Sequence, residues 1–104
     1  MKLESTIQTE IVVYFRNKYQ RNKTGLIFSV PNEATRKDKS FFSTGLLKGV
    51  SDLVIVLPGR VCFIECKTEK GRQSPEQIEF EQTVTNLGFE YYLVRSKKDF
   101  ESLF

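Results

Sequence analysis

The chain has 104 residues, a length typical of one domain, and we predict a single domain over residues 1–104. It contains no histidine, which excludes histidine-ligated zinc, Ser-His-Asp triads and histidine general bases. The net charge is only +3, so charge alone does not require a nucleic-acid partner. The sequence has neither an apolar stretch of about 18 residues nor an apolar signal-peptide core near its start, so we expect a cytoplasmic protein without a membrane partner.

The first predicted element is a helix over residues 4 to 19. Its apolar side chains recur at helical spacing: Ile7, Ile11, Tyr14, Phe15 and Tyr19. Residues 5–8, Ser-Thr-Ile-Gln, resemble a capping box, which would start the helix at Ser5.

A short apolar run, Leu26 to Val30, then predicts a strand that ends before Pro31. The next segment, residues 32–51, is long for a compact domain, and connections of this length are usually functional. We expect part of it to be helical, around Gly45 to Lys48.

The most informative segment is a predicted β-hairpin. Two apolar runs, Leu53–Leu57 and Arg60–Ile64, flank Pro58-Gly59, and Pro-Gly is a turn dipeptide. If these two residues form the loop, Leu57 pairs with Arg60. The same register then pairs the residue just before the first run with the residue just after the second.

Those flanking positions are acidic. The register places Asp52 opposite Glu65, with Cβ atoms about 5 Å apart, and strand alternation puts Lys67 on the face of Glu65. Two carboxylates held this close repel unless a cation or a proton lies between them. A hard, oxygen-seeking cation such as Mg²⁺ suits the pair and leaves room for a phosphate.

The two cysteines, Cys62 and Cys66, lie on one predicted strand about 13 Å apart. A disulfide needs Cα atoms within about 7 Å, and a catalytic thiol usually has a histidine partner. We predict that both are buried apolar residues without a redox or catalytic role.

The last third of the chain predicts a helix, a strand and a short helix. Ser74 to Gln77 is a strong helix start, with Ser as the cap, Pro at the first position and Gln at the third. Gly88 suits the end of that helix, Phe89 to Val94 reads as a strand, and Ser96 caps the final helix. The order helix, strand, hairpin, helix, strand, helix indicates an α/β fold, a mixed sheet flanked by helices.

Basic residues lie on both sides of the acidic hairpin and are our candidate phosphate contacts: Arg36, Lys37, Lys39, Lys48, Lys70 and Arg72.

At the level of motifs, Gly-Val-Ser-Asp at 49–52 and Glu-Cys-Lys at 65–67 resemble the PD-(D/E)xK nuclease signature. The context resembles its VRR-NUC branch, whose small stand-alone members occur in phages and bacteria. Three further features carry this resemblance: Glu4 with Gln8, the run Lys48–Leu53, and Ser74 with Gln77. Ser51 departs from the Pro of the superfamily name, but that position supplies no ligand atom.

The resemblance implies a restriction-endonuclease-like fold and a Mg²⁺- or Mn²⁺-dependent endonuclease acting on DNA, with a preference for branched or structured DNA such as Holliday junctions. It further implies a homodimer, a separate helicase as a candidate partner, and a bacterial cell or phage-infected host as the setting. The implied catalytic residues are Asp52, Glu65, Lys67, Gln77 and Glu4. The implied metal ligands are Asp52, Glu65, the Cys66 backbone carbonyl and Glu4.

Three alternatives stay open at this point. Glu10 competes with Glu4 as the N-terminal acid, because it lies only about 60° around the helix from Ile7. A non-catalytic DNA-binding module that keeps the fold would carry the same basic residues. A small interaction protein could use the apolar face of the first helix.

Overall fold

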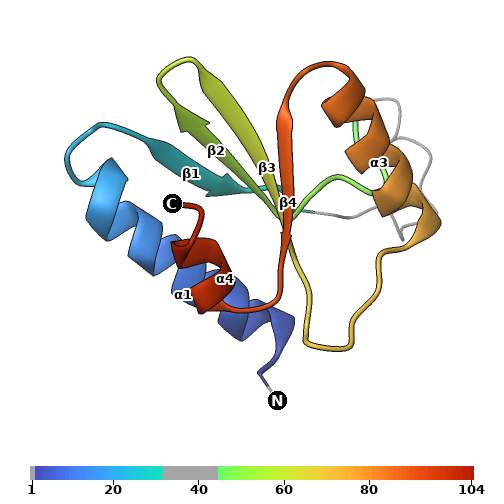
Figure 1. Ribbon diagram of the computed structural model, residues 1–104, viewed down its shortest axis with the longest axis horizontal. Helices are drawn as coiled ribbons and strands as arrows, with labels where there is room; N and C mark the ends of the chain where they lie inside the picture. The colour runs from blue at the N-terminus through green and yellow to red at the C-terminus, as the bar shows by residue number, and fades with distance from the viewer. Residues whose placement is uncertain (1, 32–44) are drawn as a thin grey trace.

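The computed structural model describes residues 2–31 and 45–104, and Figure 1 shows a four-stranded sheet with helices on both sides. The elements are α1 (Glu4–Phe15), the π-helical η1 (Arg16–Gln20), β1 (Leu26–Ser29), β2 (Leu53–Leu57), β3 (Arg60–Cys66), α3 (Pro75–Asn86), β4 (Glu90–Val94) and α4 (Lys97–Glu101). This order confirms the prediction from sequence. Within the described ranges, each helix is too short or too polar to cross a bilayer.

The sheet is mixed, with strand order β1-β2-β3-β4. The first three strands are antiparallel, whereas β3 and β4 are parallel and α3 forms the crossover between them. In the hairpin, Leu57 pairs with Arg60 and Leu53 pairs with Ile64, which confirms the predicted register. One further step along this register brings Asp52 opposite Glu65.

The two faces of the sheet pack against different helices, as Figure 1 shows, with α1 and α4 on one side and α3 on the other. On the α1 side the sheet and helices share a core of Ile7, Ile11, Phe15, Ile27, Leu53, Ile55, Cys62, Ile64, Cys66, Val94, Phe100 and Phe104. On the other face, Phe80 of α3 contacts Phe63 edge-on, with ring centroids 5.2 Å apart, and lies 6.2 Å from Tyr91. Because strand residues alternate, the face of Phe63 is also the face of Glu65.

The start of α1 differs from the prediction. Leu3 is the N-cap, its carbonyl accepts from the backbone N–H groups of Thr6 and Ile7, and no side chain caps the helix. The capping box at Ser5 is therefore wrong, and Glu4 is the first helical residue. The α-helix also ends earlier than expected, at Phe15, and continues as the wider η1.

The helical stretch expected around Gly45 to Lys48 is also wrong, because this segment forms turns and irregular backbone. Gly45 and Gly49 adopt φ values of +103° and +93°, which are incompatible with a right-handed helix.

Candidate functional site

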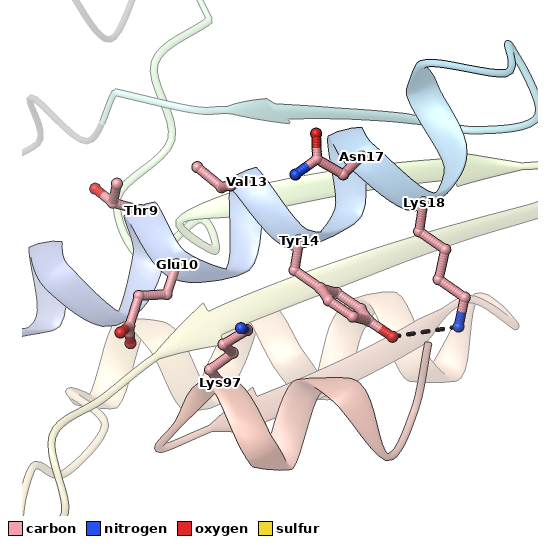
Figure 2. A pocket seen from close by; sticks show the side chains of 7 residues that line it. All are labelled: Thr9, Glu10, Val13, Tyr14, Asn17, Lys18 and Lys97. Carbon is pink, nitrogen blue, oxygen red and sulfur yellow. Dashed lines mark hydrogen bonds between the residues drawn. The ribbon is translucent and has the colours of Figure 1, made fainter.

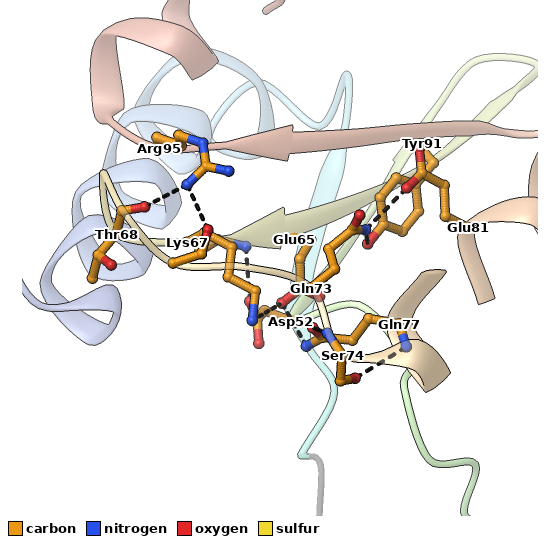
Figure 3. A network of polar contacts seen from close by, with 12 residues as sticks. Asp52, Glu65, Lys67, Thr68, Gln73, Ser74, Gln77, Glu81, Tyr91 and Arg95 are labelled. Carbon is orange, nitrogen blue, oxygen red and sulfur yellow. Dashed lines mark hydrogen bonds and ion pairs between the residues drawn. The ribbon is translucent and has the colours of Figure 1, made fainter. Parts of the chain in front are cut away.

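The Asp52 side chain is fixed across two strands at the open end of the hairpin (Figure 3). Its Oδ2 accepts from the backbone N–H of Cys66 at 2.8 Å, and its backbone carbonyl accepts from the N–H of Val30 at 2.9 Å. These contacts hold the carboxylate beside β3 without help from any flexible side chain. The predicted pairing of Asp52 with the end of β3 is therefore built into the backbone.

Glu65 is buried at the same end of the sheet, with 1% of its surface exposed. Its Oε2 accepts from Nε2 of Gln77 at 3.0 Å, whereas its buried Oε1 has no hydrogen-bond partner among the described residues. Burial, followed by the nearby charge of Asp52, raises the pKa of Glu65 to about 8, and the ammonium of Lys67 only partly opposes this shift. A buried acceptor without a partner is rare in proteins, and here it marks a place for a cation or a proton.

Lys67 directly follows β3 and is held by its backbone, whose N–H donates to the carbonyl of Val94 at 3.0 Å. Its Nζ lies 3.8 Å from Glu65 Oε2, and only 11% of its side chain is exposed. The predicted convergence of two acids and one lysine is therefore present, in a site largely screened from water.

The first turn of α3 contributes Gln77, whose side-chain oxygen and nitrogen contact different partners. With Ser74 it completes the predicted capping box, since its Oε1 accepts from the Ser74 N–H at 2.8 Å and Ser74 Oγ accepts from the Gln77 N–H at 3.2 Å. The amide nitrogen left over is the donor to Glu65. The capping box thus orients the glutamine toward the carboxylate.

Gly49 explains how the segment before Asp52 reaches α3. A Cβ added there would lie 2.3 Å from the backbone oxygen of Glu76, in the first turn of the helix, and the φ of +93° also favours glycine. The backbone of residue 49 therefore lies directly against the helical turn that carries Gln77.

The two candidates for the N-terminal acid have different surroundings. The charge of Glu4 is among the smaller causes that raise the pKa of Glu65, after burial and Asp52. Glu10 instead pairs with Lys2 at 2.8 Å. It lines a groove of about 540 Å³ on the outer side of α1 and α4, where Figure 2 shows it near Thr9 and Lys97. The influence of Glu4 on Glu65 favours Glu4, and the choice between the two acids stays a prediction.

The donor set fits a divalent cation through two carboxylates. Asp52 and Glu65 face each other, and the partnerless Glu65 Oε1 is an oxygen ligand of the kind that Mg²⁺ and Mn²⁺ prefer. Within the described residues, no three His, Cys, Asp or Glu side chains come close enough to hold one ion, and the role of Glu4 as a ligand stays a prediction. Cys66 ends β3 with its thiol buried and its pKa raised to about 12 by burial, and the role of its carbonyl as a ligand stays a prediction.

The basic residues fall into two groups. Lys48, Lys70 and Arg72 are exposed, and Lys48 Nζ lies 3.9 Å from the carboxylate of Glu76. The other predicted phosphate contacts lie outside the described residues: Arg36, Lys37 and Lys39.

Two further groups near the site were missed by the sequence analysis. Gln73 donates through Nε2 to Glu81 Oε1 at 2.9 Å and to the hydroxyl of Tyr91 at 3.1 Å, which ties the start of α3 to β4. Arg95 reaches back from the end of β4 to the backbone after Lys67. Both contacts join residues far apart in the chain, so no local pattern signals them.

An Asp-Glu-Lys cluster at the open end of a central hairpin, in a helix-flanked mixed sheet, defines the restriction-endonuclease-like class. Residues 4–98 match the family model of the VRR-NUC domain, so the chain belongs to this family of nucleases. A solved structure described as a VRR_NUC domain has the same fold, with a TM-score of 0.67 and 22% identity, over 96% of this chain and 91% of that one. A comparison with curated proteins finds no match.

Proposed function

We propose that this protein is a Mg²⁺- or Mn²⁺-dependent endonuclease that hydrolyses phosphodiester bonds in DNA. The observation that carries the proposal is the buried, partnerless Glu65 Oε1 beside Asp52, with the amine of Lys67 3.8 Å from the other Glu65 oxygen. Membership of a nuclease family supports the phosphodiester as the bond that is cut.

Each residue of the acidic cluster would have a separate role in the reaction. Asp52 and Glu65, with the Cys66 carbonyl, would hold the cation, which when bound polarises a phosphate oxygen and lowers the pKa of a coordinated water. Gln77 restrains Glu65 through Oε2, so that Oε1 is already aimed before a ligand arrives. Glu4, at the start of α1, would act through water or on a second ion.

Lys67 supplies the positive charge that this chemistry needs. Its ammonium would orient the attacking water and stabilise the negative charge that builds up on the phosphate in the transition state. Such an interaction is strongest where water is largely excluded, and 11% exposure of the Lys67 side chain meets that condition.

For the substrate, we propose branched or structured DNA such as Holliday junctions, cut by a homodimer. The described residues form one cluster of two acids and a lysine, so opposed cuts in two strands need two copies related by a twofold axis. Exposed Lys48, Lys70 and Arg72 are suited to contact backbone phosphates. A separate helicase as partner rests on the family resemblance alone.

The test is a cleavage panel of linear, nicked, flapped and four-way DNA, with Mg²⁺, Mn²⁺ or EDTA. We expect metal-dependent cleavage by the wild type, and Asp52→Ala and Lys67→Ala to lower the rate by about 100-fold or more while DNA binding persists. Arg21→Gln, an exposed change at the end of η1, is the control and should cleave normally.

A folded wild type that cuts no DNA form with either metal would overturn the proposal. If that protein still binds DNA, and Asp52→Ala binds equally well, the chain is a non-catalytic DNA-binding module.

A further inference from the structure

Arg95 holds the turn that follows Lys67. Its Nη1 donates to the carbonyls of Thr68 and Gly71, both at 2.7 Å, and lies 3.2 Å from the carbonyl of Glu69 (Figure 3 shows Arg95 beside Thr68 and Lys67). The turn itself is closed by one backbone bond, from the N–H of Gly71 to the carbonyl of Thr68 at 3.1 Å. One guanidinium nitrogen therefore gathers three backbone acceptors of a four-residue turn.

The base of this contact is rigid. Arg95 directly follows β4, and its backbone N–H donates to Oδ2 of Asp99 in α4 at 2.9 Å. Ser96 caps the same helix through the N–H of Asp99. The backbone of Arg95 is thus fixed between the end of a strand and the first turn of a helix.

The turn lies against the side chain of Lys67. A Cβ added at Gly71 would be 3.4 Å from Cδ of Lys67, so the backbone of residue 71 lies beside the aliphatic part of the lysine. The carbonyl of Val94, the neighbour of Arg95, accepts from the Lys67 N–H. Residues 94 and 95 therefore hold the lysine from two sides, at its own backbone and through the turn that covers its stem.

We propose that Arg95 is a positioning residue for Lys67: by clamping the turn 68–71, it directs the lysine amine toward Glu65. The expected effect of this positioning on DNA cleavage rests on the proposed function. The positioning of the Lys67 side chain is independent of that function, because it follows from contacts within the protein. Nη1 of Arg95 already donates to three backbone carbonyls. Although the arginine is exposed, its Nη1 contacts therefore lie within the protein, unlike those of a surface cation that is free to bind a phosphate.

The first test needs no substrate. In the purified protein with EDTA, acetylation of lysines by N-acetoxysuccinimide is followed by mass spectrometry, with Lys23, which is exposed and outside the clamped turn, as internal reference. We expect Lys67 to react more slowly than Lys23 in the wild type, and the ratio of their rates to approach one in Arg95→Gln. Arg21→Gln should match the wild type. An unchanged ratio in a folded Arg95→Gln would overturn the proposal.

Arg95→Lys separates the clamp from simple charge. It keeps the positive charge, but the lysine side chain ends one bond short of the position of Nη1, where the three carbonyls converge. Its labelling ratio should therefore lie closer to that of Arg95→Gln than to that of the wild type. It is also the milder change, should Arg95→Gln fail to fold. A wild-type ratio in Arg95→Lys would mean that charge alone suffices and would overturn the clamp.

The second test measures steady-state cleavage. Arg95→Gln should lower kcat by about 10- to 100-fold with little change in KM, because a misplaced catalytic group affects the reaction step and not binding. Arg72→Gln should instead raise KM. A higher KM with unchanged kcat in Arg95→Gln would reassign the arginine to DNA binding. A wild type without activity would overturn the proposed function only, since the labelling ratio still decides the clamp.

Discussion

Replacing Glu65 with glutamine should stabilise the protein at alkaline pH in the absence of metal. The carboxyl is 1% exposed and lies beside Asp52, and these causes raise its pKa from 4.5 to about 8. Between those values the folded protein keeps a proton on Glu65 that the unfolded chain has released. The free energy of unfolding of the wild type therefore falls as the pH rises from about 5 to about 9.

The destabilisation caused by the charged Glu65 carboxylate has an upper limit. At about 1.4 kcal/mol per pKa unit, the shift corresponds to roughly 5 kcal/mol, and relaxation or water entry would reduce the cost to roughly 1–3 kcal/mol. Glutamine removes this cost: its oxygen still accepts from Gln77, and its amide nitrogen turns the partnerless position into a donor near Asp52. Domains are stable by only about 5–15 kcal/mol, so the change is easily measured.

Urea unfolding with EDTA at pH 5, 7 and 9 tests this reasoning. We expect Glu65→Gln to match the wild type near pH 5 and to exceed it at pH 9, while Mg²⁺ raises the stability of the wild type alone. Glu79→Gln, an exposed change on α3, is the control and should run parallel to the wild type. A Glu65→Gln curve that stays below the wild type by the same amount at every pH would refute the argument, because it would mean that the carboxyl is a net stabiliser.

Further predictions concern α3 and the buried thiols. Gly49→Ala should lower the unfolding free energy by about 2–4 kcal/mol, because its Cβ would collide with the Glu76 carbonyl. Gly88→Ala is the control, since Gly88 has a similar φ of +94° with open space around it, and it should lower the unfolding free energy by only about 1 kcal/mol. Equal losses in urea unfolding would contradict the close approach of Gly49 to α3. Gln77→Ala and Ser74→Ala should each lower the unfolding free energy by about 1 kcal/mol through the loss of helix capping, but only Gln77→Ala should also lower kcat. Equal kcat values for the two variants would show that the hydrogen bond from Gln77 to Glu65 does not contribute to catalysis. Iodoacetamide should label the buried cysteines only as fast as the protein unfolds, since burial raises the pKa of Cys62 to about 11 and that of Cys66 to about 12; rapid labelling of the native protein would contradict this.

The acidic cluster was predictable because its geometry follows from local rules. A Pro-Gly turn sets a two-residue loop, the loop sets the register, and strand alternation then places Asp52 opposite Glu65 and Lys67 on the same face. The cap of α3 was predictable for the same reason, since Ser74 and Gln77 satisfy each other within one turn. The predicted cap at Ser5 was wrong because Leu3, two residues earlier, already supplies the carbonyl that begins α1.

What the sequence by itself determined is therefore the order of the elements, the hairpin register and the three charged residues at its open end, because each depends on neighbours in the chain. Only the tertiary structure decided the surroundings of these residues. Glu65 is buried with one oxygen unsatisfied, and the spare amide of Gln77 restrains the other oxygen. The charge of Glu4 acts on Glu65, and Arg95 donates to the turn beside Lys67. The physical reason is that burial, and the pKa shift that follows from it, arise where helices close over a sheet, and those contacts join residues that no local pattern in the chain connects.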